Sequence, residues 1–310
     1  MLNDPHKKLS RKNFFISAAV VMLFASVCSI ELEQKRAFAD SGAAFPSVVA
    51  TNSQTQIASG IAHSCLLSRT GTVKCWGSNS FGQLGKDSTA NLGDGSGEMA
   101  ALGAINLGTN KTATAITAGD YHTCALLNDR TVKCWGLNSS GQLGRDLTPN
   151  WGDNTGEMAF LAAINLGTNK TAVAITAGGS HTCALLNDGT VKCWGLNSSG
   201  QLGRDNVLSW GDGTGEMAAL GAINLGTNKT ATAITAGQHH TCALLNDGTV
   251  KCWGLNSSGQ LGKDSTAALG DGTGEMAALG AINLGTNKTA VGVSAGGSHT
   301  CAVLNDGTVK

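Results

Sequence analysis

The sequence predicts an all-β fold, a β-propeller of four-stranded blades with about 59 residues per blade. Three observations predict it. Cysteine, histidine and tryptophan recur at a fixed step of 59 residues. Each repeat consists of short apolar runs separated by Gly, Asn and Asp, and no run keeps a 3.6-residue period. Gly accounts for 43 of 310 residues, whereas Pro (3) and aromatic residues (5%) are scarce, which excludes collagen and coiled coils.

Residues 1–39 are expected to direct export rather than to join the fold. A basic head (1–13) precedes an uncharged, mostly apolar run over 14–30, and Ala37-Phe38-Ala39 offers a small-x-small cleavage site. Three interpretations stay open: a cleaved signal peptide, a lipoprotein signal at Cys28, or an uncleaved membrane anchor. All three place the rest of the chain outside the cytosol. The expected localisation is therefore secreted, cell surface or periplasm, with membrane contact only through an uncleaved N-terminal segment.

A lead-in strand is expected over residues 40–54, and repeats fill residues 55–310 with about four and a half units. The copies are close, since units 169–227 and 228–286 are identical at 50 of 59 positions. A period of this length indicates a solenoid, propeller or array, in which one unit cannot bury its apolar face alone.

Four short strands are expected in each unit. In the unit 169–227 they span 172–177, 182–186, 190–194 and 222–225, because each is a short apolar run bounded by turn residues. Asn187-Asp188-Gly189 suits a three-residue hairpin turn that ends in a left-handed glycine. Four strands per unit match one propeller blade.

The hairpin register predicts disulfide bonds. A three-residue turn places Cys183 opposite Cys193, and directly opposed Cα atoms about 4.5 Å apart lie within disulfide range. Reduced cysteines packed as small apolar residues are the alternative, disfavoured by the export signal. Zinc is less favoured, because nine residues separate the two cysteines. The expected pairs are Cys65–Cys75, Cys124–Cys134, Cys183–Cys193 and Cys242–Cys252.

The segment 178–203 contains Trp-Gly-x-Asn-x-x-Gly-Gln-Leu-Gly and resembles the repeat of the regulator of chromosome condensation family. The resemblance covers the chain from about residue 55 to its end and implies a β-propeller, normally with seven blades. The units present would then form an incomplete ring, truncated at the C-terminus, with the partner of Cys301 expected one residue after Lys310. The paired cysteines and the added segment 211–217 resemble the exported bacterial branch.

Catalytic and metal-binding chemistry is not expected. One histidine per unit falls on a circle about the propeller axis, so each is expected to bond its own turn backbone rather than to converge on a metal. Asp212 and Glu216 could offer oxygens to calcium, but a Gly-rich turn explains them as well. No hydrolase, metalloprotease or phosphate-loop motif occurs, so the sequence predicts no enzyme and no cofactor. The repeated histidines are His63, His122, His181, His240 and His299.

The candidate binding residues lie where near-identical copies differ. One variable site follows the first strand and the other is the loop after Gly-Gln-Leu-Gly. Loops on a constant scaffold often carry binding, and aromatic and arginine side chains are enriched in interface hot spots. Packing is the slightly favoured alternative for the two tryptophans, because Leu92 and Leu269 occupy the same slot. The candidates are Tyr121, Arg145, Trp151, Arg204, Trp210 and His239.

The leading function is an exported propeller that binds a macromolecule through its variable blade loops. The partner is expected to be a protein of unknown identity, or a surface glycan. Nucleic acid is not expected, because residues 40–310 carry a net charge of −3. The first alternative is guanine-nucleotide exchange on a small GTPase, which the family resemblance implies. The second is a structural or adhesin repeat array.

Overall fold

The computed structural model of the protein describes residues 55–310. The chain divides into two compact units, Met1–Ala44 and Phe45–Lys310, and the described residues all belong to the second. The expected export segment (1–39) and lead-in strand (40–54) lie outside the described residues. Within residues 55–310, no helix is both long enough and apolar enough to cross a bilayer.

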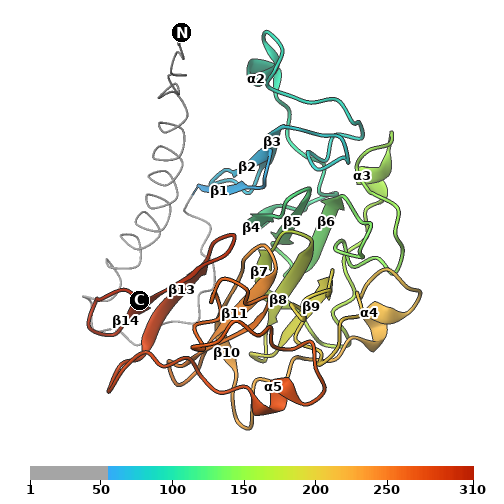
Figure 1. Cartoon of the computed structure of the whole chain (residues 1–310). Helices are drawn as coiled ribbons and strands as arrows, with labels where there is room; N and C mark the ends of the chain where they lie inside the picture. The colour runs from blue at the N-terminus through green and yellow to red at the C-terminus, as the bar shows by residue number, and fades with distance from the viewer. Residues whose placement is uncertain (1–54) are drawn as a thin grey trace, which may run out of the picture. The chain divides into compact units, whose positions relative to one another are not determined.

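The described region is a series of small antiparallel sheets that follow one another in chain order (Figure 1). First strands are β1 (Gln56–Ser59), β4 (Ala113–Ala118), β7 (Ala172–Ala177), β10 (Ala231–Ala236) and β13 (Ala290–Ala295). Second strands are β2 (His63–Leu67), β5 (His122–Leu127), β8 (His181–Leu186), β11 (His240–Leu245) and β14 (Thr300–Leu304). Third strands are β3 (Val73–Gly77), β6 (Val132–Gly136), β9 (Val191–Gly195) and β12 (Val250–Gly254).

The sheets correspond to the sequence repeats. We number the units 55–109, 110–168, 169–227, 228–286 and 287–310 as first to fifth. The first four each hold a three-stranded sheet, and the fifth holds the two-stranded sheet β13–β14. Each first strand contacts the first strand of the next unit, so the units lie side by side along one edge.

The hairpin between the second and third strands has the predicted register. Cys183 lies opposite Cys193, with Cα atoms 4.1 Å apart, and the two form a disulfide. In the turn, Gly189 has a φ of 78° and donates its N–H to the carbonyl of Leu186 over 2.9 Å. This left-handed residue lets a three-residue turn close a regular ladder. The other three predicted pairs, Cys65–Cys75, Cys124–Cys134 and Cys242–Cys252, are also bonded.

The predicted fourth strand is absent from the described units, and that prediction is wrong. The segment 222–225 touches β9 through one backbone hydrogen bond, from Ile223 N to Val191 O over 2.9 Å. At the opposite end of β9, Gly195 pairs with Trp210 instead. The outer edge of the third strand is thus bonded only near its two ends, and no ladder forms between them.

Short helices occur where the sequence analysis expected none. Each is a single turn of four residues, too short to show a helical period, and each begins after a left-handed glycine. In the second to fourth units this helix is tied to the preceding unit, as where Asp146 Oδ1 accepts the Met217 N–H over 2.7 Å. The helices are α2 (Glu98–Ala101), α3 (Glu157–Phe160), α4 (Glu216–Ala219) and α5 (Glu275–Ala278).

The hydrophobic core lies between neighbouring sheets rather than within one. The cluster between the second and third units combines Cys124 and Val132 from one side with Leu186 and Trp194 from the other. Each of these side chains is no more than 1% exposed. Because the cluster draws on two units, one unit alone cannot bury its apolar face.

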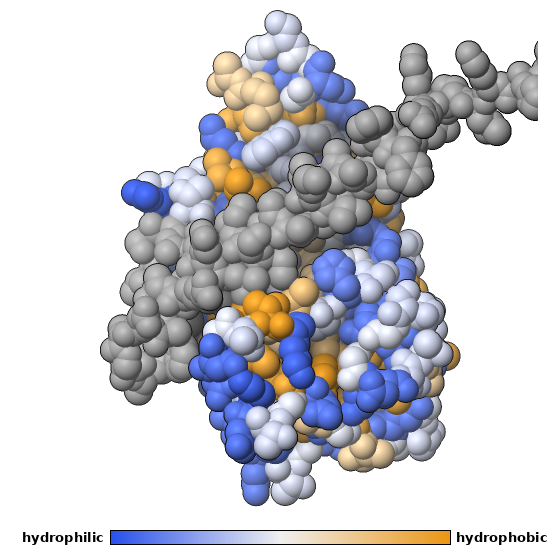
Figure 2. All heavy atoms as spheres, turned by 60° about the vertical axis from the view of Figure 1, so that its left-hand side comes forward, coloured by the Kyte–Doolittle hydropathy of each residue, from blue (hydrophilic) through white to orange (hydrophobic). Residues whose placement is uncertain are grey.

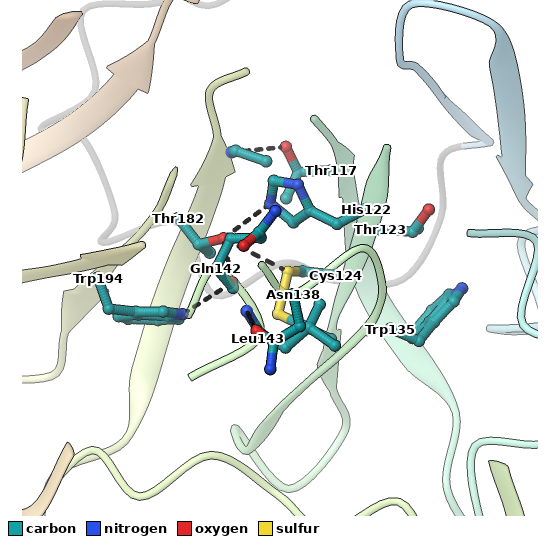
Figure 3. The surroundings of a disulfide bond; sticks show 12 residues. Thr117, His122, Thr123, Cys124, Trp135, Asn138, Gln142, Leu143, Thr182 and Trp194 are labelled. Carbon is teal, nitrogen blue, oxygen red and sulfur yellow. Dashed lines mark hydrogen bonds between the residues drawn. A yellow bond between two sulfur atoms is a disulfide. The ribbon is translucent and has the colours of Figure 1, made fainter. Parts of the chain in front are cut away.

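Buried hydrogen bonds join the same two units (Figure 3). Thr182 Oγ1 donates to the carbonyl of Gln142 over 2.9 Å and accepts from His122 Nε2 over 2.9 Å. Trp194 Nε1 donates to the same carbonyl over 3.1 Å. The expectation that each histidine bonds its own turn is therefore wrong, because the imidazole reaches a threonine of the next unit. The pattern repeats for His63–Thr123, His181–Thr241 and His240–Thr300.

These histidines are neutral at pH 7. Burial lowers the pKa of His122 and of His181 to about 3, and that of His63 and of His240 to about 4. The threonine hydroxyl donates its proton to the glutamine carbonyl, so it can only accept a hydrogen bond from the imidazole. Nε2 therefore carries the imidazole proton. Nδ1 is buried and has no hydrogen-bond partner among residues 55–310. A second proton there would find no acceptor.

The first sheet exposes an isoleucine whose equivalent in the second unit is buried. Ile57 on β1 is 70% exposed, whereas the equivalent Ile116 in the second unit is 9% exposed. The difference arises because Ile116 packs in the cluster between the first two units. Hydrophobic residues also gather between hydrophilic ones on the surface shown in Figure 2. This position is covered only where another sheet lies against it.

Candidate binding face

Two sets of variable loops lie at the same end of the sheets. In each of the first four units the first and third strands run in the same direction, so the loops that follow them emerge together. Leu137 N, just after β6, donates to the carbonyl of Tyr121, just after β4, over 2.9 Å. We term this end the loop face; in the second unit it comprises residues 119–121 and 137–151, and in the third 178–180 and 196–210.

The loops that follow the first strands, which we term the inner loops, are joined to one another by backbone hydrogen bonds. Asp120 N donates to Gly179 O over 3.0 Å, and Gly179 N donates to Gln238 O over 3.0 Å. The predicted residues Tyr121 and His239 follow this line and are half-buried. The Tyr121 ring packs edge-on against Phe81 of the first unit, with ring centroids 5.3 Å apart. The variable side chains thus project from a backbone that neighbouring units hold in place.

The loops that follow the third strands, which we term the outer loops, pair each predicted tryptophan with a predicted arginine. The guanidinium carbon of Arg145 lies 3.6 Å from the centroid of the Trp151 ring, and that of Arg204 lies 3.9 Å from the Trp210 ring. Trp151 Nε1 donates to the carbonyl of Glu157 over 2.9 Å, which fixes the ring. Each tryptophan is therefore packed below and covered by a cation above.

Charge on these arginines persists despite partial burial. Burial lowers the pKa of Arg145, and Glu157 opposes that shift. Arg204 shows the same pattern, with burial lowering its pKa and Glu216 opposing. Because a guanidinium stays protonated in proteins, both pairs present a positive charge at physiological pH.

The first and fourth units replace the pair with lysine and leucine. Lys86 Nζ donates to the carbonyls of Gly103 and Ala104 over 2.5 and 3.1 Å. In the fourth unit, Lys263 Nζ makes the same two bonds to Gly280 and Ala281 over 3.0 and 3.1 Å. The tryptophan slot then holds Leu92 or Leu269. The cationic residue and the residue at the tryptophan position thus change together, from arginine and tryptophan to lysine and leucine.

Exposed apolar side chains accompany the arginine–tryptophan pairs. Leu147 is 53% exposed, Val207 52% and Leu208 66%. The fourth unit has Ser265, Thr266 and Ala267 at the corresponding positions, and the first unit has the same three residue types. The middle two units therefore present a more apolar loop face than the units beside them.

The acidic turns considered for calcium are occupied by their own backbone. Glu216 Oε2 accepts N–H groups from Gly211, Asp212 and Gly213 over 2.7, 3.1 and 2.9 Å. The same nest forms around Glu275. In the part of the chain that the structure describes, no three acidic, histidine or cysteine side chains are grouped to hold a metal ion.

Four of the six predicted residues form two contacting pairs, and Tyr121 and His239 lie on the inner loops of the same face. The exchange of Arg–Trp for Lys–Leu was not predicted, although aligning the copies shows it at residues 86, 145, 204 and 263. Phe81 was not predicted as the neighbour of Tyr121 either. That contact joins two units, so no comparison within one repeat reveals it.

A family model for the regulator of chromosome condensation (RCC1) repeat matches four segments of the chain: 54–83, 113–142, 172–201 and 231–260. In each of the described units that it matches, the segment runs from the first strand to the loop after the third strand. The matched segments recur at the same 59-residue step as the cysteines and histidines.

Curated relatives contain similar repeats. Human probable E3 ubiquitin-protein ligase HERC6 is 33% identical over 214 residues, which is 68% of this chain and 19% of the ligase. The mitochondrial RCC1 domain-containing protein RUG3 of Arabidopsis thaliana is 30% identical over 81% of this chain and 52% of its own length. This chain thus spans about a fifth of the ligase and about half of RUG3.

Solved structures show the fold. The crystal structure of Kap60 bound to yeast RCC1 (Prp20) matches with a TM-score of 0.63 at 21% identity, over 85% of this chain and 57% of that one. Prp20p from Saccharomyces cerevisiae, studied with its binding to Gsp1p and histones, matches with a TM-score of 0.62 at 21% identity, over 85% and 58%. The described region therefore has the fold of an RCC1-like β-propeller.

Proposed function

The chain belongs to the regulator of chromosome condensation (RCC1) repeat family, and on that premise we propose that it is a non-catalytic module whose loop face binds a protein partner. A rigid repeat scaffold that carries variable loops at one end is an arrangement often used for recognition. The fold itself does not select a partner, because unrelated functions share the propeller scaffold. The proposal therefore depends on the loop face.

One observation carries the proposal. The third and fourth units differ at nine of 59 positions, and eight of these lie on the loop face, at 179–180, 204 and 206–210 with their counterparts. The ninth, Val173 against Thr232, lies on a first strand. Packing alone does not explain this distribution, because the same core residues accept either loop sequence.

Export of the module forms part of the proposal. Four disulfides join the hairpins of the described region, and such bonds persist mainly in oxidising compartments. The basic head and apolar run of residues 1–39 support the same placement. Intact mass of the protein from its native host, with and without thiol alkylation, tests this point. Alkylation of the eight hairpin cysteines without prior reduction would exclude an oxidising location.

Two other functions give different results. Guanine-nucleotide exchange on a small GTPase would take place in a reducing compartment, with free thiols and measurable nucleotide release. A structural repeat array would show no effect of Trp151→Ala and Trp210→Ala on any partner, because no single face would be used. The binding proposal expects disulfides and a loss confined to loop-face variants.

Site-specific crosslinking in the native host tests which face is used. A photoreactive amino acid replaces Leu147 on the loop face in one variant, and Asp188 in a hairpin turn at the opposite end in the other. We expect a covalent partner adduct from position 147 and none from position 188. Equal adducts from both positions, or none from position 147 when the protein is produced at its native level, would contradict the proposal.

A further inference from the structure

We infer that the loop face of the second and third units docks an acidic protein segment that also carries apolar side chains. This inference rests on the proposed function and adds the chemistry of the partner. The surface involved, termed the arginine–tryptophan patch, comprises Arg145, Leu147, Trp151, Arg204, Val207, Leu208 and Trp210.

The two guanidinium groups have donors to spare. Within residues 55–310, neither Arg145 nor Arg204 makes a side-chain hydrogen bond or an ion pair, the guanidinium of each lies over its tryptophan ring, and Arg204 Nε is buried without a hydrogen-bond partner. The equivalent Lys86 and Lys263 each donate to two carbonyls of their own unit. A guanidinium offers five N–H donors in a fixed fork. The middle units therefore present cationic donors that the neighbouring units use internally.

The tryptophans hold these donors in place before any partner arrives. Trp151 is fixed by its indole bond to Glu157 O and by backbone bonds to Gly136 over 2.7 and 3.1 Å. Trp210 Nε1 donates to Glu216 O over 2.8 Å. Stacking on a fixed ring restricts the arginine side chain, and this lowers the ordering cost of binding.

The two pairs belong to one surface across the seam between units. Trp151 and Trp210 both pack against the core cluster that the second and third units share. Asp146, next to Arg145 in the chain, accepts the Met217 N–H of the third unit. Arg145 therefore lies at the seam, with the Arg145–Trp151 pair belonging to the second unit and the Arg204–Trp210 pair to the third.

A cavity of about 240 Å³ extends the patch beside Arg204. Its walls include Arg204, Gly221, Ala222 and Met276. In the first and fourth units a lysine ammonium reaches the two carbonyls equivalent to those of Gly221 and Ala222. A Cβ added at Gly221 would meet no atom within 4 Å, so this space is open. The third unit thus has room for a partner side chain next to a guanidinium.

Nearby carboxylates are already engaged by backbone donors. Asp146 and Asp205 each accept the N–H of the second residue in the helix of the following unit, over 2.7 Å. Glu157 and Glu216 each accept three N–H groups of their own turn. Their charge is therefore partly compensated by these donors. Glu157 and Glu216 still attract Arg145 and Arg204 electrostatically, but within residues 55–310 neither guanidinium makes a hydrogen bond to a carboxylate.

The chemistry of the patch favours a peptide over other anions. A carboxylate matches the guanidinium fork in two parallel hydrogen bonds. The exposed Leu147, Val207 and Leu208 would be buried by apolar side chains, which a sulfated glycan lacks. An acidic segment with interspersed leucines supplies both contacts.

Peptide binding tests the inference in the intact disulfide-bonded protein. The probe is a fluorescent peptide of alternating leucine and glutamate, compared with the same peptide carrying glutamine and with a sulfated oligosaccharide. The matched variant is Arg145→Lys, Trp151→Leu, Arg204→Lys and Trp210→Leu, which gives the middle units the residues of the outer ones without changing net charge. We expect the native protein to bind the glutamate peptide about tenfold more tightly than the glutamine peptide. We expect the variant to lose that difference.

Several results would overturn the inference. These are equal affinity for the two peptides, undiminished binding by the four-residue variant, or tighter binding of the oligosaccharide. An unchanged thermal midpoint and four intact disulfides show that the variant is folded, as Lys–Leu units already are in the native chain. Crosslinking from position 147 is a separate measurement. Adducts there with no glutamate preference would reject the acidic partner and leave the proposed function standing.

Discussion

Arg130 occupies the third position of a hairpin turn with a φ of 65°. The other four hairpin turns place glycine there, as at Gly189 with a φ of 78°. A left-handed conformation costs a residue with a Cβ about 1–2 kcal/mol. We expect Arg130→Gly to raise the free energy of unfolding by about 1 kcal/mol, measured by denaturant titration with the disulfides intact.

The reverse change is the control for Arg130. Gly189→Arg is expected to lower the free energy of unfolding, because it introduces the same conformation and brings a Cβ to 2.6 Å from Thr230 Cβ. If Arg130→Gly leaves stability unchanged while Gly189→Arg lowers it, the steric contact rather than the backbone conformation sets the cost.

Residue types on the loop face were predictable, but their contacts were not. Comparing copies identified Trp151 and Trp210 as positions where tryptophan replaces leucine. Their stacking under Arg145 and Arg204 depends on how a loop folds back over its own unit, which spacing does not reveal. Whether these residues bind a partner stays a prediction.

At the scale of elements, Thr182 is the hydrogen-bonding link between β8 and the preceding unit. Its hydroxyl contacts His122 Nε2 and Gln142 O, each over 2.9 Å, in a fully buried setting. Thr182→Val keeps the shape and leaves the imidazole N–H without an acceptor. We expect a loss of about 2 kcal/mol in the free energy of unfolding.

Thr232→Val is the matched control on a neighbouring strand. Thr232 Oγ1 also bonds a backbone carbonyl, that of Leu244 over 3.2 Å, but it lies at the surface. The third unit already carries Val173 at this position. We expect a change within about 0.5 kcal/mol. Equal losses for the two variants would show that the bonds between units contribute nothing beyond local substitution effects.

Local elements were more predictable than edges. The hairpin register followed from the turn Asn187-Asp188-Gly189, because turn length fixes which residues face each other. The fourth strand failed because segment 222–225 has the same kind of sequence as a strand yet makes one ladder bond to β9. Pairing at a sheet edge depends on competing neighbours, here Trp210 on Gly195.

For the whole molecule, the buried histidines predict a loss of stability in mild acid. In the unfolded chain each histidine binds a proton near pH 6.5, whereas in the folded state burial delays protonation until about pH 3 to 4. Between these values the unfolded state binds more protons. The free energy of unfolding should therefore fall as the pH is lowered from 6.5 to 4. The slope of this fall is proportional to the number of extra protons that the unfolded state binds, which is at most one for each histidine.

Denaturant titration across this pH range measures the effect. His181→Gln should be less stable at pH 7 and should show a shallower pH dependence, since one of four titrating groups is gone. A separate loss is expected below about pH 4. There burial raises the pKa of Asp188, but hydrogen bonds from Lys170 and Thr190 lower it to about 2. Constant stability between pH 6.5 and 4 would contradict the assignment of neutral, buried histidines.

The architecture of the whole followed from periodicity, whereas the contacts between units did not. A 59-residue step and hairpin-sized apolar runs indicated a propeller, and solved structures show that fold. The bonds from His122 to Thr182 and from Asp146 to Met217 join residues 60 and 71 positions apart. Repeats define what each unit contains, and the side-by-side placement of units determines which of those groups meet.

The seams have a consequence for how such a gene changes. The three junctions among the first four described units use the same residue types on both sides, with His–Thr, Trp–Gln and Asp–Met bonds repeated from unit to unit. Recombination between two near-identical copies that deletes or duplicates one 59-residue unit therefore recreates a junction of the kind it removed. Unequal crossing-over can shuffle Arg–Trp and Lys–Leu loops, or change the copy number, without a new interface having to evolve.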